Sequence, residues 1–330
     1  MLTRADKISV KAAEWWYNFG ESFLNLILYR GHKGIAVHKN LRYDDGKRGV
    51  LDIIEKPDGV VGKPVLIYIH GGGFVSGEAR SRRFYCYEWV DKGFVAINMR
   101  YDYAADAVHP EHLRQLFKGI DFALDIVGRG GADTSRIIIA GDSAGGYFAA
   151  MVSAIAAKPE LYDAFGIEFG RRDSFLPAAC ITISGLFDPV RSVGTGFPDM
   201  KKFARAFLGM SKREFAESKD GDFAKLSAVD SHVGANFPPS FVIKSCADPL
   251  RSESDRLADA LEKAGVRHDG FLCRGINGVH AGGLACRLAK SGRECLVKTR
   301  DFVFSVLDAR KGGEVAQDGS APLDEAVVTE

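Results

Sequence analysis

Between residues 50 and 273 the sequence has short, continuous runs of Val, Ile, Leu and Phe, separated by longer segments with helical spacing. Runs without polar alternation are typical of strands that are buried on both faces of a largely parallel sheet. Seven segments fit this description: 50–55, 64–70, 94–99, 136–140, 178–184, 240–246 and 270–273. Because helices must cover both faces of such a sheet, the pattern predicts an α/β fold with a mostly parallel central sheet.

The segments between these runs divide the chain into a core and additions. Core helices are predicted over residues 80–92, 111–127, 144–157, 253–264 and 284–307. Residues 1–45, with Trp15, Trp16 and Phe19 at helical spacing, are predicted to form N-terminal cap helices, and residues 46–310 the core. The core is interrupted at about 188–237 by an insertion long enough to form a lid or cap. The tail 311–330 lacks an apolar period and is expected to be disordered.

The charge balance and the spacing of the cysteines limit the kinds of partner and cofactor that we expect. The 44 Lys and Arg residues balance 43 Asp and Glu residues, so no global field attracts nucleic acid or an anionic membrane. We therefore expect a small-molecule substrate, and nothing in the sequence argues against a homodimer. The six cysteines are scattered singly, without a Cys-x-x-Cys pair, which predicts neither a metal site nor a cofactor.

Three cysteines, Cys180, Cys246 and Cys273, lie in apolar runs and are expected to be small buried hydrophobes in a reducing compartment. The first apolar run, 23–29, is too short to span a bilayer and lies too far from the N-terminus for a signal peptide. We expect no integral membrane segment and a cytoplasmic location.

The first chemical motif is the segment 141–146, Gly-Asp-Ser-Ala-Gly-Gly, which connects the predicted strand 136–140 to the predicted helix 144–157. A Gly-x-Ser-x-Gly sequence in a strand-turn-helix setting is typical of a nucleophile elbow. The turn is so sharp that only glycine tolerates the crowding around it. The motif predicts Ser143 as a nucleophile; the alternative is a glycine-rich turn with an incidental serine.

The second motif is the segment 70–74, His-Gly-Gly-Gly-Phe, at the end of the predicted strand 64–70. Consecutive glycines allow backbone N–H groups to point toward a developing oxyanion. We expect Gly72, Gly73 and Ala144 to be the donors of an oxyanion hole. There are two alternatives. One is a phosphate-binding loop, but the lysine and the glycine spacing of such loops are missing. The other is a turn with a purely structural role.

A serine nucleophile needs a histidine base, and the base needs an acid to fix its tautomer. Asp248 follows the predicted strand 240–246 at its C-terminal end, where catalytic groups gather, and Asp188 is the second candidate acid. His280 follows the strand 270–273, whereas His268 precedes it and belongs at the opposite edge of the sheet. We therefore predict Asp248 and His280, and expect His70 to orient the glycine loop.

These motifs, in this order, resemble the hormone-sensitive lipase family of α/β hydrolases, which includes bacterial esterases. The resemblance covers roughly residues 64–307, and it implies a cap built from the N-terminal helices and from an insertion after the sixth core strand. The chain departs from the family at 101–106, where Tyr-Asp-Tyr-Ala-Ala-Asp replaces the frequent Tyr-Arg-Leu-Ala-Pro-Glu. It also has Gly282 where a phenylalanine is frequent.

The resemblance implies a serine carboxylesterase that acts on short- to medium-chain acyl esters and needs no cofactor. An amidase or deacetylase with the same machinery is the first alternative, and a non-catalytic ligand receptor on the same fold is the second. Five aromatic residues are candidates for substrate contact, with plain packing as their alternative role: Trp15, Phe74, Tyr147, Phe203 and Phe207.

Overall fold

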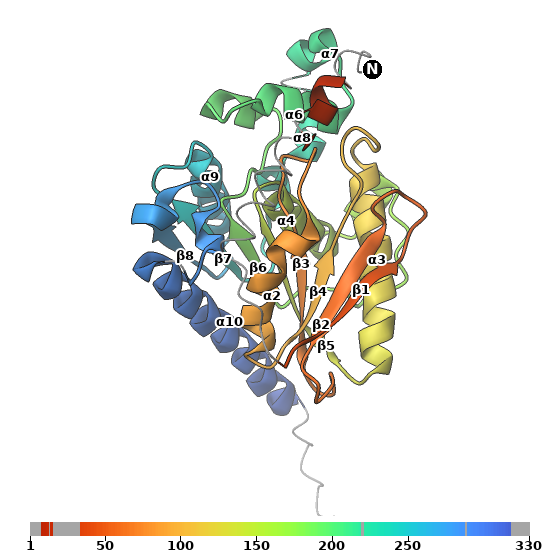
Figure 1. The fold of residues 1–330 in the computed structure, drawn as a ribbon, viewed down its shortest axis with the longest axis vertical. Helices are drawn as coiled ribbons and strands as arrows, with labels where there is room; N and C mark the ends of the chain where they lie inside the picture. The colour runs from red at the N-terminus through yellow and green to blue at the C-terminus, as the bar shows by residue number, and fades with distance from the viewer. Residues whose placement is uncertain (1–7, 13, 16–33, 219–220, 288, 318–330) are drawn as a thin grey trace, which may run out of the picture.

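The fold is described from a computed structural model, which covers residues 8–12, 14–15, 34–218, 221–287 and 289–317, with side chains to residue 310. The described residues form one sheet of eight strands in the order β1-β2-β4-β3-β5-β6-β7-β8 (Figure 1). The strands are β1 (Ala36–Arg42), β2 (Val50–Glu55), β3 (Pro64–Ile69), β4 (Val95–Met99), β5 (Asp133–Asp142), β6 (Ala179–Ile183), β7 (Ser240–Ser245) and β8 (His268–Cys273). The pairs β1–β2 and β2–β4 are antiparallel, and all other pairs are parallel.

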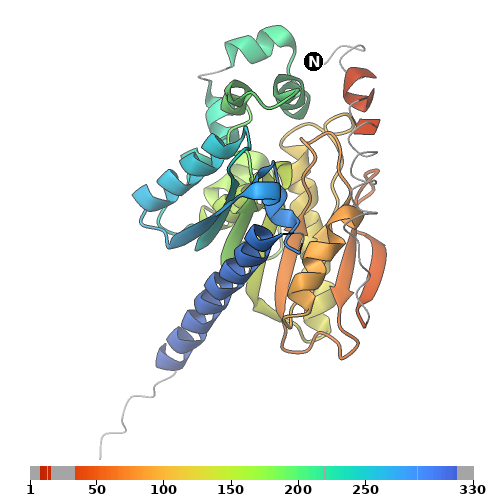
Figure 2. The ribbon, with the colours of Figure 1, turned by 60° about the vertical axis from the view of Figure 1, so that its left-hand side comes forward.

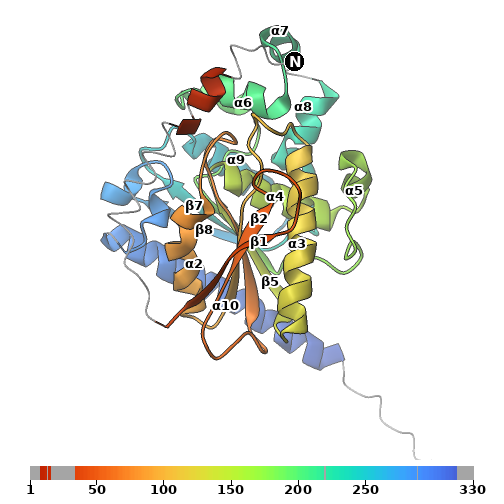
Figure 3. The same ribbon diagram turned by 45° about the vertical axis from the view of Figure 1, so that its right-hand side comes forward.

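Helices cover both faces of this sheet, as the apolar runs predict (Figures 2 and 3). Successive residues of a strand point to opposite faces, and in β3 Ile67 belongs to one buried cluster while Leu66 belongs to the other. The first cluster contains residues of α3 (Glu111–Arg129), α4 (Ala144–Ala157) and α9 (Arg251–Lys263). The second contains residues of α2 (Arg83–Val90) and α10 (Lys290–Gln317).

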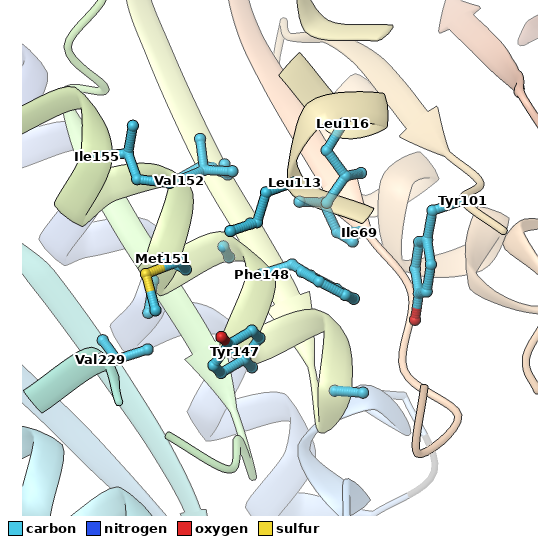
Figure 4. Packing of buried hydrophobic residues seen from close by; sticks show 14 of the residues in the cluster. Ile69, Tyr101, Leu113, Leu116, Tyr147, Phe148, Met151, Val152, Ile155 and Val229 are labelled. Atoms are coloured by element: carbon cyan, nitrogen blue, oxygen red, sulfur yellow. The ribbon is translucent and has the colours of Figure 1, made fainter. Parts of the chain in front are cut away.

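The central helix α4 is buried along most of its length, since even Ser153 on it is fully buried. Its Phe148, Met151 and Val152 pack with Leu113 and Leu116 of α3 (Figure 4). This packing fixes the start of α4 relative to the sheet. Residue 143 lies at that start.

The insertion between β6 and β7 is helical. After α5 (Glu160–Phe165) and β6, the chain forms η2 (Arg191–Thr195), α6 (Met200–Leu208), α7 (Lys212–Glu217), α8 (Asp222–Ser227) and η3 (Val229–His232). Helices α6, α7 and α8 gather at one end of the molecule, together with the described N-terminal residues 8–12 and 14–15 (Figures 1 and 3). Of those N-terminal residues, Val10 is buried in the first cluster.

Two boundaries differ from the sequence prediction. Strand β1 lies inside the segment 1–45 that was predicted as cap helices, because β1 is a half-exposed edge strand without an apolar run and is held by pairing with β2. Helix α10 continues through residues 311–317 of the predicted disordered tail, since each added residue gains a backbone bond on an existing helix. Residues 16–33 and 318–330, on which the rest of these two predictions falls, lie outside the described residues.

Two further expectations concern the burial of three cysteines and the absence of a membrane-spanning segment. Cys180 and Cys273 are buried, but Cys246 is exposed, because β7 ends at Ser245 and leaves the thiol in the following turn. All six cysteines are free. In the described part of the chain, no helix combines the length and the apolar character that crossing a membrane requires.

Candidate active site

Ser143 occupies a sharp turn between β5 and α4. Its backbone has φ 51° and ψ −119°, a conformation that is uncommon for a residue with a side chain. A Cβ atom on Gly141 or on Gly145 would lie less than 3.0 Å from backbone carbonyl groups, those of Gly145 and Ile69 respectively. The two glycines of the motif are therefore required by close backbone contacts, as the sequence analysis expects for a nucleophile elbow.

The imidazole of His280 lies between Ser143 and Asp248. Its Nε2 is 3.0 Å from the Oγ of Ser143, and its Nδ1 is 3.0 Å from each carboxylate oxygen of Asp248. Burial raises the pKa of Asp248, but the hydrogen bond and charge of His280 and the N–H of Leu250 outweigh it and lower the pKa overall. An ionised carboxylate only accepts hydrogen bonds, so Nδ1 carries the proton and Nε2 is free to accept one from the serine.

The loop that carries His280 is held in place by a buried side chain. Asn277 donates from Nδ2 to the carbonyl groups of Gly282 (2.8 Å) and Ala285 (3.0 Å), and its Oδ1 accepts from the N–H of Gly292 (3.0 Å). These bonds connect both ends of the loop between β8 and α10. Asn277 could not be predicted from the sequence, because a single asparagine in a loop has no local pattern that marks this role.

The glycine loop after β3 forms a tight turn beside this triad. Gly72 and Gly73 have φ values of 127° and 60°, which favour glycine. The carbonyl of Gly72 accepts from the N–H groups of Val75 and Ser76 and from the Ser76 hydroxyl, which closes the turn. Among the described residues, the N–H groups of Gly72 and Gly73 donate to no protein acceptor, so they are available to a ligand.

His70 is fully buried beneath the turn and does not contact the triad. Its Nδ1 donates to the carbonyl of Gly71 (2.7 Å), and its ring stacks on Tyr101 at 4.5 Å between centroids. Burial lowers the pKa of His70 to about 3, so the ring is neutral at ordinary pH. These contacts fit the expectation that His70 orients the loop.

A buried ion pair joins the glycine loop to the nucleophile elbow. The carboxylate of Asp142 accepts hydrogen bonds from Nε and Nη2 of Arg82, at 3.0 Å each. It also accepts from the hydroxyl of Tyr68 at 2.8 Å and from the N–H of Gly71 at 3.0 Å. Burial raises the pKa of Asp142, but the charge and hydrogen bonds of Arg82, with those of Tyr68 and Gly71, lower it overall. Sequence analysis did not single out Arg82, since nothing near it in the chain indicates its partner.

The two discarded candidates for acid and base lie elsewhere. The Oδ1 of Asp188 accepts from the N–H groups of Val190 and Arg191, both at 2.9 Å, so this carboxylate stabilises the start of η2. His268 is the first residue of β8, at the opposite edge of the parallel strands, and bonds the carbonyl of Val266.

The aromatic candidates for substrate contact have different environments. Phe74 and Phe207 are fully buried and stack on each other at 3.9 Å, and Tyr147 is fully buried and donates to the carbonyl of Ser227. The structure gives these three a packing role between α6, α8 and the core. Phe203 is buried against the glycine loop, where a Cβ on Gly73 would lie 2.9 Å from its ring, whereas Trp15 is 67% exposed.

One cap residue that the sequence analysis did not select reaches the triad. The ring of Phe197, in the insertion, packs edge to face with the imidazole of His280 at 4.8 Å between centroids. The insertion thus contacts both His280, through Phe197, and the glycine loop, through Phe203. Within the described residues, no cluster of His, Cys, Asp and Glu could hold a metal ion.

Comparison with known proteins identifies the family to which the chain belongs. Residues 66–277 match the model of a family described as having the alpha/beta hydrolase fold, so the chain belongs to that family of α/β hydrolases. It is 25% identical over 226 residues to esterase LipQ of Mycobacterium tuberculosis, which covers 67% of this chain and 51% of the relative. It is 33% identical over 170 residues to human hormone-sensitive lipase, which covers 51% of this chain and 15% of that protein. The resemblance to hormone-sensitive lipase and its relatives is thereby confirmed.

A solved structure supports the fold independently. Esterase B from Lactobacillus rhamnosis superposes with a TM-score of 0.81 over 94% of this chain and 99% of its own, at 19% identity. Another structure of the same esterase is inhibited by a C4-C4 tributyrin phosphonate. The chain spans about half the length of the mycobacterial relative.

Proposed function

We propose that the protein is a serine carboxylesterase that hydrolyses short- to medium-chain acyl esters through a covalent acyl-enzyme. His280 takes the proton of Ser143, and the serine oxygen attacks the ester carbonyl. The N–H groups of Gly72, Gly73 and Ala144 stabilise the oxyanion, and His280 gives the proton to the leaving alcohol. Water, activated by His280, then releases the acid.

The observation that carries the proposal is the position of the His280 ring, 3.0 Å from both the serine oxygen and the buried carboxylate of Asp248. A general base must lie within hydrogen-bond reach of the proton it takes, and this one also has an ionised acid behind it. The preference for short chains is supported by the C4-C4 phosphonate on the structurally similar esterase B.

The test compares Ser143→Ala with Ser153→Ala, which removes a buried hydroxyl on α4 that donates to the carbonyl of Ala149. We expect Ser143→Ala to lose at least about 10³-fold in p-nitrophenyl butyrate hydrolysis and all labelling by a fluorophosphonate, and the control to keep both. A folded Ser143→Ala protein with wild-type activity would disprove the assignment.

A series of p-nitrophenyl esters from acetate to palmitate tests the acyl preference. A maximum at the longest chains would contradict it. Matched anilide substrates separate an esterase from an amidase, since faster turnover of the anilides would favour the latter.

A further inference from the structure

The glycine loop depends on a contact at its far end, at Gly77. Gly77 has φ 105°, and a Cβ atom on it would lie less than 3.0 Å from the carbonyl oxygen of Gly71 and from the Nδ1 of His70. The backbone at Gly77 therefore packs directly against Gly71 and His70. Because Gly72 follows directly, the position of Gly77 influences the direction of the proposed oxyanion donors.

Tyr103 holds Gly77 from outside the loop. Its hydroxyl donates to the carbonyl of Gly77, and its ring lies edge to face with the ring of His70, at 6.4 Å between centroids. The side chain is fully buried, and burial raises the pKa of Tyr103, so the hydroxyl remains a donor throughout the neutral pH range. Residue 103 lies in the segment where the chain departs from the related family, and a leucine, frequent there, could not donate this hydrogen bond.

Arg48 covers the ring of Tyr103 and connects it to the N-terminal segment. The guanidinium carbon lies 3.6 Å from the centroid of the Tyr103 ring, a cation–π contact. Its Nη2 bonds Glu14 at 2.6 Å, and its Nη1 lies 3.3 Å from a carboxylate oxygen of Asp106. Glu14 and Arg48 are both mostly buried, with side chains 19% and 24% exposed, so this pair is less screened than a surface pair.

We propose that Tyr103 is a positioning residue for the glycine loop, and that Arg48, paired with Glu14, holds its ring, so that the contact between Glu14 and Arg48 influences kcat. The inference rests on the proposed esterase function and deepens it. It assigns to Tyr103 no contact with substrate. Its effect is on kcat, because donors aimed at the oxyanion stabilise the transition state more than the bound ester.

The direct test is Tyr103→Phe, which removes only the hydroxyl. We expect kcat for p-nitrophenyl butyrate to fall about 10-fold while KM stays within about 2-fold and the melting temperature is nearly unchanged. The matched control is Tyr162→Phe, whose buried hydroxyl has no hydrogen-bond partner among the described residues and lies in another part of the core. We expect the control to keep wild-type kcat.

The contribution of the contact between Glu14 and Arg48 is tested by introducing Glu14→Gln into the wild-type protein and into Tyr103→Phe. We expect a loss of about 2- to 3-fold in kcat in the wild type and no further loss when Tyr103→Phe is present, because both changes act on one path. An equal loss in both backgrounds would overturn the link, and wild-type kcat in a folded Tyr103→Phe protein would overturn the whole inference. If the wild-type protein itself hydrolyses no ester, the proposed function fails, and this inference fails with it.

Discussion

Replacing Arg82 with methionine would test how much the buried pair beneath the site contributes to stability. The change removes two hydrogen bonds of 3.0 Å to Asp142, whose side chain is 1% exposed, and leaves its carboxylate in the interior. Removing one partner of a buried pair costs about 3–5 kcal/mol. Because Asp142 would keep the Tyr68 hydroxyl and the Gly71 N–H, we expect the lower end of that range, about 3 kcal/mol.

The loss should depend on pH in a direction that the structure specifies. In the wild type, the folded-state pKa of Asp142 lies below its ordinary value, so its stabilisation is present above about pH 4 and is lost as the pH falls through the folded-state pKa. Without Arg82, burial raises the folded-state pKa above the unfolded value, so folding takes up a proton. The destabilisation of Arg82→Met should therefore be largest near pH 8 and shrink toward pH 5.

The assay is urea unfolding of both proteins between pH 5 and pH 8, with Arg213→Met as the control. Arg213 pairs with Glu217 at 2.9 Å on the surface, where both side chains are mostly exposed, and such a pair contributes about 0.5 kcal/mol or less. Adding Asp142→Asn to Arg82→Met should recover part of the loss by removing the unpaired charge. Equal losses of stability in Arg82→Met and Arg213→Met, or a loss in Arg82→Met that is the same at every pH, would contradict a buried, charged Asp142 held by Arg82.

Two further changes test the elbow and the acid. Gly145→Ala would bring a Cβ atom against the carbonyl of Ile69, and we expect at least about 100-fold slower labelling by a fluorophosphonate, whereas Gly194→Ala meets nothing within 4 Å and should label normally. Asp248→Asn should lower kcat on the order of 10³-fold or more, because the amide no longer selects the productive tautomer, and Asp188→Asn should change it little. Normal labelling of the first glycine variant, or a reversed order of the two asparagine variants, would contradict the geometry.

The sheet could be predicted from sequence because its strands are buried on both faces. Continuous apolar runs are required there, and the predicted helix 144–157 coincides with α4 because it is enclosed by apolar neighbours. Strand β1 needs no continuous apolar run, because it lies at the edge of the sheet with Lys39 and Asn40 exposed. Its pairing with β2 stabilises it instead. Apolar patterning therefore predicts the interior of the sheet better than its edge.

Within the site, the residues that could be predicted are those with strict local requirements. Ser143 needs glycines on both sides, and the order of elements along a parallel sheet brings Asp248 and His280 to the same edge. Phe207 was a candidate for substrate contact, with packing as its alternative role, and the structure places its ring against Phe74. Periodicity identifies a buried face, and the residues that cover it depend on the tertiary fold.

The residues that hold the site in place contact partners far away in the sequence, and for this reason they could not be predicted from it. Arg82 acts on Asp142 across 60 residues, and Phe197 contacts His280 from the separate cap insertion. Their side chains have no preferred local partner, so the same residue types on the surface would look identical in sequence. The two kinds of residue meet at Gly71, which has no room for a side chain beside Asp142 and donates its N–H to that carboxylate, whose charge Arg82 balances. The glycines define where the chemistry can occur, and the distant contacts determine how precisely its groups are held.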